Sequence, residues 1–462
     1  MWRALNAISR CILLVRVPKL MLTVWLVLAL AVIPLHANAD DGSDENAAKA
    51  ALTPDRGESV PSDCVVVIKS RDEQEDDELP GGFAESRAAD ESERGVIERF
   101  WLDGEVEYRY EELRRLAGDD DGGVTDRGYE RDVALLLGAN LEFAGDWRLR
   151  AALRSGREGR PLTNWVGVDD LGDKRWLGLE EYWLRKDLET GRGQSLRLQG
   201  GRFTFPFELT QLTIDNDLYM SGGYAQYRWE PNGGELARIR LSLLGAQLLS
   251  GCEGSGPARV LSARLDSRWE VAKSVSWDAA LSYHGLSNAD TIQAAVAGGD
   301  WRVGGPASGG VTTNAVVDGN PMNPLVSDFR IADLWLNGVM RADGDWPIEL
   351  ECEYARNLGA RGPAQGECDA VLTGVRVGRR GDPGDWQFGL EHVIVEQDAV
   401  LAAVNRGKYA TNYEGTELEA RYCPYDGVEW RVTYTLSHNL KDLVPGFHFD
   451  DRELRLLVSY TW

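Results

Sequence analysis

Nine arginines stand at alternate positions in segments that are otherwise largely apolar. In an extended strand, residues i and i+2 share a face. Arg148 and Arg150, for example, interleave with Leu149 and Ala151. The basic set is Arg148, Arg150, Arg154, Arg197, Arg228, Arg238, Arg240, Arg264 and Arg268. A row of guanidinium groups along an aqueous path would attract anions and repel cations.

Carboxylates show the same spacing in other segments: Asp103, Glu105, Glu107, Glu349, Glu351, Glu353, Glu417 and Glu419. The basic positions fall between residues 148 and 268, in strands that neighbour one another, and the acidic positions flank them. If the strands follow one another around a closed barrel, a basic wall would face an acidic wall across a water-filled interior. The alternative is that both signs pair across neighbouring strands and simply solvate the interior. The two arrangements are compatible.

A third candidate is the segment G-G-R-F-T-F-P-F, which begins at Gly200 and is followed by Asp215-Asn216-Asp217. A strand ends here in glycines, and a Pro-Phe loop with two acids follows. We expect this loop to fold into the interior and narrow it; the alternative is a loop packed at the end of the barrel. Its members are Arg202, Phe203, Pro206, Phe207, Asp215 and Asp217.

Motifs of enzymes and of cofactor sites are absent. The sequence has no G-x-x-x-x-G-K-[ST], no H-E-x-x-H and no G-x-S-x-G pattern. The histidines after residue 40 are His284, His392, His438 and His448, with no serine or aspartate at an informative spacing. The aspartates at 119–121 and 169–170 could bind divalent cations, but solvated turns explain them as well. We therefore expect no enzyme, no cofactor and no protein metal centre.

The elements that must position the charged residues are two-faced strands of about ten residues, which recur from Trp101 onward. The segment from Glu453 to Trp462 is the clearest: Leu454, Leu456 and Val458 share one face with Tyr460 and Trp462. Such strands, about sixteen in number (alternatives 14 or 18), predict an all-β fold, a transmembrane antiparallel up-and-down β-barrel. Tyr460 and Trp462 would then lie at the membrane interface.

The connections between these strands alternate in length. Short turns rich in Gly, Asp or Pro occur near residues 144–146, 272–274 and 380–385, and between them lie long segments such as 111–130, 203–218, 286–328 and 396–412. Strict alternation is typical of a barrel with short periplasmic turns and long extracellular loops. A soluble β-sandwich would not separate the connections in this way.

The first 95 residues differ from the rest. Residues 1–39 read as a signal peptide: four basic residues, an apolar core over 20–35, then Ala37-Asn38-Ala39 before Asp40. An uncleaved anchor is the alternative. Residues 40–95 are acidic and poor in aromatics, as in a disordered periplasmic extension. Residues 96–462 would form the barrel, and no stretch in them has the roughly 18 apolar residues of a spanning helix.

Net charge and cysteine count exclude further classes. The formal charge of −24 becomes −28 without residues 1–39, which argues against nucleic-acid binding. Five cysteines remain after the leader, an odd number, so no complete disulfide framework is expected. Cys252 with Cys368 would be the most plausible bridge.

Four short motifs resemble a porin family of Gram-negative outer membranes: L-E-E-Y-W-L from Leu179, G-R-F-T-F-P-F from Gly201, I-D-N-D-L from Ile214 and G-G-Y-A from Gly222. The motifs span about 50 residues. The chain departs from the family at Phe205, where an asparagine is expected. The resemblance implies an outer-membrane porin barrel and supplies no catalytic or ligand-binding residues.

The function expected from these patterns is passive diffusion of small hydrophilic or charged solutes through a water-filled channel in the outer membrane. Export or uptake of an anionic polysaccharide, and a non-conducting structural barrel, are the alternatives. The partners expected are outer-membrane lipid and lipopolysaccharide, the barrel assembly machinery and small hydrophilic solutes, with no nucleic acid. A homotrimer is one option for the oligomeric state.

Overall fold

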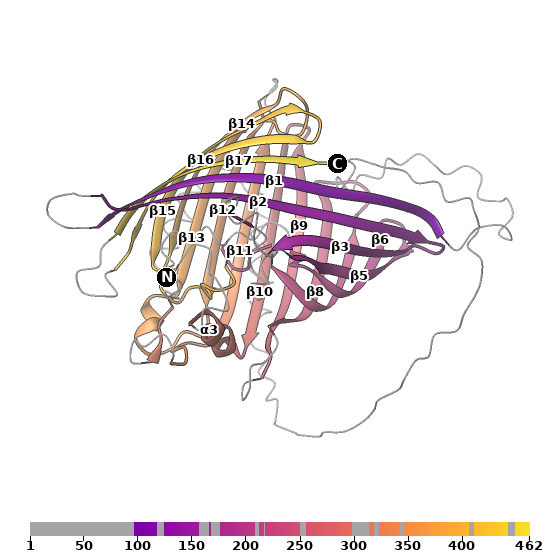
Figure 1. Ribbon diagram of the computed structural model, residues 1–462. Coiled ribbons are helices and arrows are strands. Elements are labelled where there is room, and N and C mark those ends of the chain that lie inside the picture. Colours follow the sequence, from indigo (N-terminus) through magenta and orange to yellow (C-terminus); the bar gives the residue numbers. More distant parts are fainter. Residues whose placement is uncertain are drawn as a thin grey trace, which may run out of the picture. The chain divides into compact units, whose positions relative to one another are not determined.

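The computed structural model describes residues 97–117, 124–156, 166–167, 176–207, 212–216, 218–249, 256–297, 314–317, 323–341, 346–405, 411–441 and 449–462. These residues form a closed antiparallel up-and-down barrel of sixteen strands, which confirms the predicted fold and strand number (Figure 1). The two-residue strand β4 (Val166–Gly167) is a short addition that pairs with β2 beyond the end of β3. The proposed leader and acidic extension lie outside the described residues.

The strands follow one another around the barrel in chain order. They are β1 (Ile97–Ala117), β2 (Val124–Phe143), β3 (Trp147–Gly156), β5 (Trp176–Gly191), β6 (Gln194–Thr204), β7 (Tyr219–Trp229), β8 (Leu236–Leu249), β9 (Ala258–Ala272), β10 (Val275–Ser287), β11 (Phe329–Met340), β12 (Ile348–Asn357), β13 (Asp369–Gly378), β14 (Trp386–Val395), β15 (Tyr413–Tyr425), β16 (Val428–Asn439) and β17 (Phe449–Thr461).

The barrel closes where β17 pairs with β1, and the two strands lie side by side in Figure 1. The register pairs Tyr108 with Val458 and Glu105 with Thr461. Just beyond the last pair, the amide of Trp462 donates to the carbonyl of Gly104 (3.1 Å), and the amide of Gly104 donates back (3.2 Å). The predicted closing strand therefore leaves no unpaired edge at this seam.

The polarity of the barrel wall is the reverse of that of a soluble protein. Leu241, Leu243, Leu390 and Leu418 are 45–53% exposed on the outer face. Polar and charged side chains are buried on the inner face, including Asp103, Arg150, Ser242, Arg264, Asp333, Glu351, Glu417 and Thr435. The period-two alternation of the sequence is the direct cause, since each strand turns one of its two faces outward.

The first two strands are longer than the sequence pattern indicates. Residues 111–130 were expected to be a loop, but β1 continues to Ala117 and β2 begins at Val124. Backbone pairing explains the difference, because β1 is paired on both sides over these residues, to β2 and to β17. A tight turn at Arg192-Gly193, with Gly193 at φ 66°, joins β5 to β6 and was not predicted.

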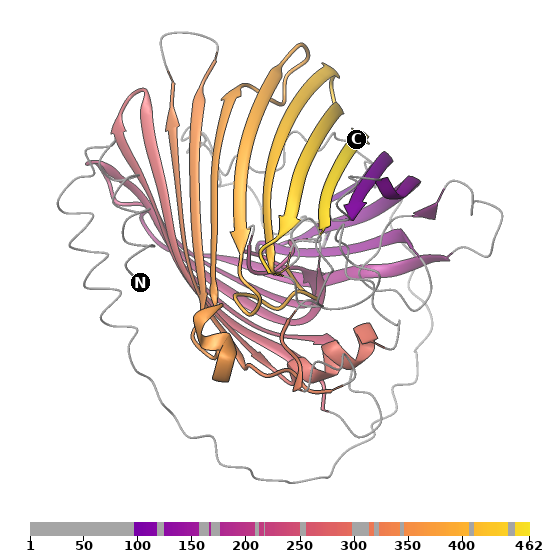
Figure 2. The same ribbon diagram turned by 90° about the vertical axis from the view of Figure 1, so that its left-hand side faces the viewer.

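The long connections lie at one end of the barrel. Helix α3 (Ala289–Ala297) follows β10, and the 3₁₀ helix η4 (Gly362–Gly366) follows β12; Figure 2 shows both at the same end. No helix in the described part of the chain is long and apolar enough to cross a membrane.

Candidate functional site: a charged interior and a loop folded into it

All nine predicted basic residues lie on the inward face of neighbouring strands. Arg148, Arg150 and Arg154 are on β3, Arg197 on β6, Arg228 on β7, Arg238 and Arg240 on β8, and Arg264 and Arg268 on β9. In the register, Arg240 stands opposite Asp266 and Arg264 opposite Ser242, and both partners are buried polar residues of the interior. This run of strands is therefore rich in arginine on its inner face.

The predicted acidic residues are on the inward face of other strands. Asp103, Glu105 and Glu107 are on β1, Glu349, Glu351 and Glu353 on β12, and Glu417 and Glu419 on β15. Glu353 is fully buried, and Glu351 and Glu417 are nearly so. Since β17 pairs with β1, the late acidic strands continue into the first one around the barrel.

A network of ion pairs and hydrogen bonds joins four strands beside the closing seam. The Arg150 guanidinium on β3 pairs with Asp103 on β1, over the intervening strand β2. It also donates to Asn140 Oδ1 (3.0 Å) and to Glu181 Oε2 (2.9 Å). Gly138 of β2 lies beneath the bridge, where a Cβ would overlap the Asp103 carboxylate. A glycine at this position is what allows the two charges to meet.

Similar pairs occur around the interior. Arg197 bonds to Asp187 (2.8 Å) and Arg240 to Asp266 (2.5 Å). On the acidic side, Arg376 reaches Glu351 (2.6 Å). Cross-strand ion pairs therefore occur beside an uneven distribution of charge around the inner face.

Further charged side chains face inward beside the predicted basic and acidic sets. They are Arg109, Asp132, Glu181, Arg185, Asp187, Asp266, Asp278, Arg376, Glu391, Arg421, Glu429, Arg431, Glu453 and Arg455. The same period-two rule identifies them once the register of each strand is known. Four of these residues are arginines on β13 to β17. The inner face of these strands therefore carries charges of both signs, with carboxylates in excess.

The loop after β6 turns into the barrel and packs against the inner wall. Phe203, Phe205 and Phe207 are 1–4% exposed. The rings of Phe205 and Phe207 lie 5.1 Å apart, and both approach His284 of β10, at 5.8 and 6.0 Å. Met220, Leu244 and Val260, from three successive strands, complete this apolar seat.

The far end of the same loop reaches a different part of the wall. Leu212 is fully buried against Ile331, Leu372 and Val393 of β11, β13 and β14. Its amide donates to Glu353 Oε1 of β12 (3.0 Å). The described residues of this loop thus lie within the barrel, with Phe205 and Phe207 near β10 and Leu212 against β11 to β14.

The predicted members of this loop have different positions. Phe203 and Phe207 form the apolar seat, whereas Pro206 and Asp215 are partly buried. The prediction for Arg202 needs correction: it shares its face of β6 with the exposed Leu198 and bonds to Glu180 (2.9 Å). Alternation along the strand turns it away from Phe203. Asp217 lies outside the described residues.

A second loop inside the barrel was not predicted. Val400, Leu401 and Val404, after β14, are fully buried. The amide of Asp215 donates to the carbonyl of Val404 (2.8 Å), which joins this loop to the first. The run A-V-L-A-A-V at 399–404 was the available signal, because so apolar a segment is unusual for a solvated loop.

A buried carboxylate anchors the second loop. Asp398 accepts a hydrogen bond from the Ala315 amide (2.8 Å) and another from the Ser327 hydroxyl (2.6 Å). Burial raises the pKa of Asp398 above its usual range, and these hydrogen bonds oppose the rise. Asn314 donates to the carbonyls of Gln397 (2.9 Å) and Val400 (2.8 Å). The segment after α3 therefore holds the loop in place.

Aromatic residues collect on the outer face near the short turns. Tyr460 is 49% exposed and stacks on Trp462, with ring centroids 5.6 Å apart. Trp346, Phe388, Trp386 and Tyr422 form a further stack, with successive centroids 4.4–6.0 Å apart. This placement fits the interface role expected for Tyr460 and Trp462.

Metal and disulfide chemistry receive no support from the described residues. Among them, no group of three or more His, Cys, Asp or Glu is arranged to hold a metal ion. Cys368 and Cys423 are free thiols. Cys252, the suggested partner of Cys368, lies outside the described residues.

Comparison with known proteins gives a likeness of overall structure. No family model matches the sequence, and no curated protein matches it. Among solved structures, the chain is similar to Pseudomonas putida OprB (13% identity, TM-score 0.46, covering 78% of this chain and 94% of that one). It is also similar to a Rhodopseudomonas blastica porin variant (11%, 0.38, 79% and 100%) and to the outer membrane channel DcaP of Acinetobacter baumannii (12%, 0.39, 79% and 97%).

Proposed function

We propose that this barrel spans the outer membrane and conducts small hydrophilic or charged solutes through its interior. The observation that carries the proposal is the reversed polarity of the wall, apolar outside and charged inside. Several inner side chains remain partly open to solvent, including Arg376 (18% exposed), Arg455 (27%) and Arg431 (29%). A closed barrel satisfies every backbone group within the membrane, and a lumen of this kind is aqueous.

The inward loop after β6 is the proposed constriction. It occupies part of the cross-section while its phenylalanines are buried in the wall, so its polar backbone is left to border the solute path. The loop after β14 supports it through the Asp215–Val404 hydrogen bond. Solutes would then pass between this loop and the charged wall.

Loosening the seat of the loop should change conduction without unfolding the barrel. Truncating a buried phenylalanine costs about 3–5 kcal/mol where the site cannot collapse. Phe207→Ala is therefore expected to give channels in a planar bilayer with altered conductance and more frequent current fluctuations. Phe388→Ala, which truncates an exposed ring on the outer face, is the control. Identical traces for both variants would remove the loop from the conducting path. If the unmodified protein folds and inserts but shows no conductance, the non-conducting structural barrel is the alternative that remains.

The membrane orientation of the wall is tested by two neighbouring leucines on β17. Leu456 stands opposite Val432 and Tyr110 on the outer face, and Leu457 stands opposite Arg431 and Arg109 on the inner face. Leu456→Arg should cost roughly 2–4 kcal/mol near the bilayer midplane, whereas Leu457→Arg should cost much less. Both free-energy costs are measured by urea titration of the protein in lipid vesicles. The folded fraction at each urea concentration is read from the gel mobility of unheated samples. Equal costs would mean that the outer face does not meet lipid.

A further inference from the structure

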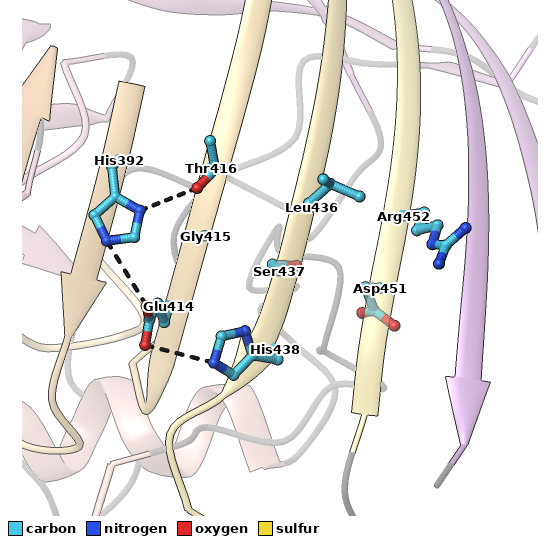
Figure 3. A pocket seen from close by; sticks show the side chains of 9 residues that line it. All are labelled: His392, Glu414, Gly415, Thr416, Leu436, Ser437, His438, Asp451 and Arg452. Atoms are coloured by element: carbon cyan, nitrogen blue, oxygen red, sulfur yellow. Dashed lines mark hydrogen bonds and ion pairs between the residues drawn. The ribbon is translucent and has the colours of Figure 1, made fainter. Parts of the chain in front are cut away.

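A polar cluster on the outer face of the barrel has no part in the proposed channel. It comprises His392 of β14, Glu414 of β15, His438 of β16 and Arg452 of β17. Figure 3 shows these side chains on four neighbouring strands. With Thr416 and Leu436 they border a cavity of about 330 Å³.

The two histidines share a single carboxylate. His392 Nε2 lies 3.7 Å from one oxygen of Glu414, and His438 Nε2 lies 3.4 Å from the other. The Nδ1 atom of His392 is also hydrogen-bonded to the Thr416 hydroxyl (3.0 Å). Both imidazoles are 43% exposed, so the cluster is open from outside.

The cluster lies directly beyond the apolar belt, on the side of the long loops. His392, Thr416, Leu436 and Arg452 form one row across the sheet, and Leu390, Leu418, Tyr434 and Leu454 form the next. The residues of this second row are 36–53% exposed. If the barrel spans a membrane, as proposed above, the first row lies where lipid headgroups meet acyl chains.

Arg452 is the basic group available to a ligand. It makes no ion pair with any residue that the structure describes, unlike most arginines of the barrel. In the register, Arg452 stands opposite Arg114 of β1 and Leu436 of β16, and Asp450 stands opposite His438. Asp451 shares the inner face with Ser437 and is buried.

Protonation of the histidines would give this site a net positive charge. With neutral imidazoles, the charges of Glu414 and Arg452 cancel. Histidine is the side chain that ordinarily changes charge between pH 5 and 8. With both imidazoles charged, His392, His438 and Arg452 carry three positive charges against the single negative charge of Glu414.

We propose that this cluster binds the phosphate of a lipid headgroup when its histidines are protonated. An arginine guanidinium suits a phosphate because it can donate two parallel hydrogen bonds, and two imidazolium groups add charge-assisted donors. Leu436, within the same cavity, offers an apolar surface to the attached chain. The source of the phosphate is therefore a lipid of the surrounding leaflet, not a soluble ion.

Lipid binding at two pH values tests the proposal. The full chain, folded in neutral detergent, is titrated with dioctanoyl phosphatidylglycerol, whose charge is constant between pH 5.5 and 8, and with dioctanoyl phosphatidylcholine. We expect phosphatidylglycerol to bind about tenfold more tightly at pH 5.5 than at pH 8, the size of one added charge-assisted hydrogen bond. Phosphatidylcholine carries an ammonium group that compensates the phosphate charge. Its change in log Kd between pH 8 and pH 5.5 should be less than half of that of phosphatidylglycerol.

Four variants assign the effect to residues. The double change His392→Gln and His438→Gln should keep the weak binding of pH 8 at both pH values, and Arg452→Gln should weaken binding at both. Glu414→Gln removes the central carboxylate and should strengthen binding at pH 8. Arg330→Gln, at an exposed outward position of β11, is the control and should behave as wild type.

Three outcomes would overturn the inference: equal binding at both pH values, acid-enhanced binding in the double histidine variant, or the same saturation by inorganic phosphate alone. The last would identify a soluble ligand in place of a lipid. Conductance is measured on the same preparations. A conducting protein without pH-dependent lipid binding would refute this inference alone, whereas failure to insert and conduct would refute the proposed function.

Discussion

Adding one methyl group at Gly104 is expected to prevent most of the protein from reaching its closed form. A Cβ at this position would lie 2.8 Å from Cε2 of Trp462 and 2.9 Å from the carbonyl oxygen of Leu136. The indole would have to leave, together with the reciprocal Gly104–Trp462 backbone hydrogen bonds. Two hydrogen bonds at about 1 kcal/mol each, and about 1 kcal/mol from the Tyr460–Trp462 stack, correspond to roughly a hundredfold shift in the folding equilibrium.

The measurement is the fraction of Gly104→Ala protein that migrates as the compact, heat-modifiable form on a gel after folding into lipid vesicles. Gly223→Ala is the matched control, because a Cβ at Gly223 has its nearest neighbour at 3.9 Å. Removing Trp462 altogether should resemble Gly104→Ala, whereas Trp462→Ala keeps the backbone bonds and should be milder. Normal folding of both Gly104→Ala and the deletion would show that the seam does not depend on this contact.

The inward or outward direction of successive side chains along each strand is the part of the fold that the sequence predicts best. A strand with one face toward an apolar solvent and the other toward water has to alternate, and a slip by one residue would exchange the two faces. The residues of β17 illustrate this, since Leu454, Leu456 and Tyr460 pair with outward residues of β1 and β16 throughout. Strand length was less predictable, because pairing between β1 and β2 continues beyond the alternating segment.

The interior loops could be predicted only in part. The Phe203–Phe207 segment suggested an inward loop because a strand ends in glycines there and a Pro-Phe loop with two acids follows. In the structure, its phenylalanines share an apolar seat. That seat is supplied by Met220, Leu244 and Val260, on the inner face near the long-loop end, and no local pattern marks that part of the wall as apolar. Arg202 was misplaced for a simpler reason: it belongs to β6 and follows that strand's alternation, so it was wrongly grouped with the loop after it.

Bridges between non-adjacent strands lie beyond any local pattern. Asp103 and Arg150 were predicted to belong to opposite walls, but they meet across β2 because Gly138 leaves space between them. Recognising this requires the relative register of three strands. The outer histidine cluster is similar, since His392, Glu414 and His438 are adjacent only after β14, β15 and β16 are aligned.

Removing charge from the two walls is expected to shift ion selectivity in opposite directions. Arg197, Arg228 and Arg268 represent the basic wall, and Glu349, Glu417 and Glu419 represent the acidic one. The triple Arg→Gln variant should become more cation-selective and the triple Glu→Gln variant more anion-selective, because like charges along a narrow aqueous path repel co-ions. Reversal potentials across a salt gradient measure both shifts.

The shifts should shrink at high salt, because the Debye length falls from about 10 Å at 0.1 M to about 3 Å at 1 M. Arg202→Gln is the control for the first variant: it lies on β6 like Arg197, but on the opposite face, and should leave the reversal potential unchanged. Local ion pairs such as Arg197–Asp187 reduce the expected effect of each single residue, so the walls are tested as sets. Wild-type reversal potentials in both triple variants, with normal conductance, would mean that the ions bypass these residues and that the conducting path lies elsewhere.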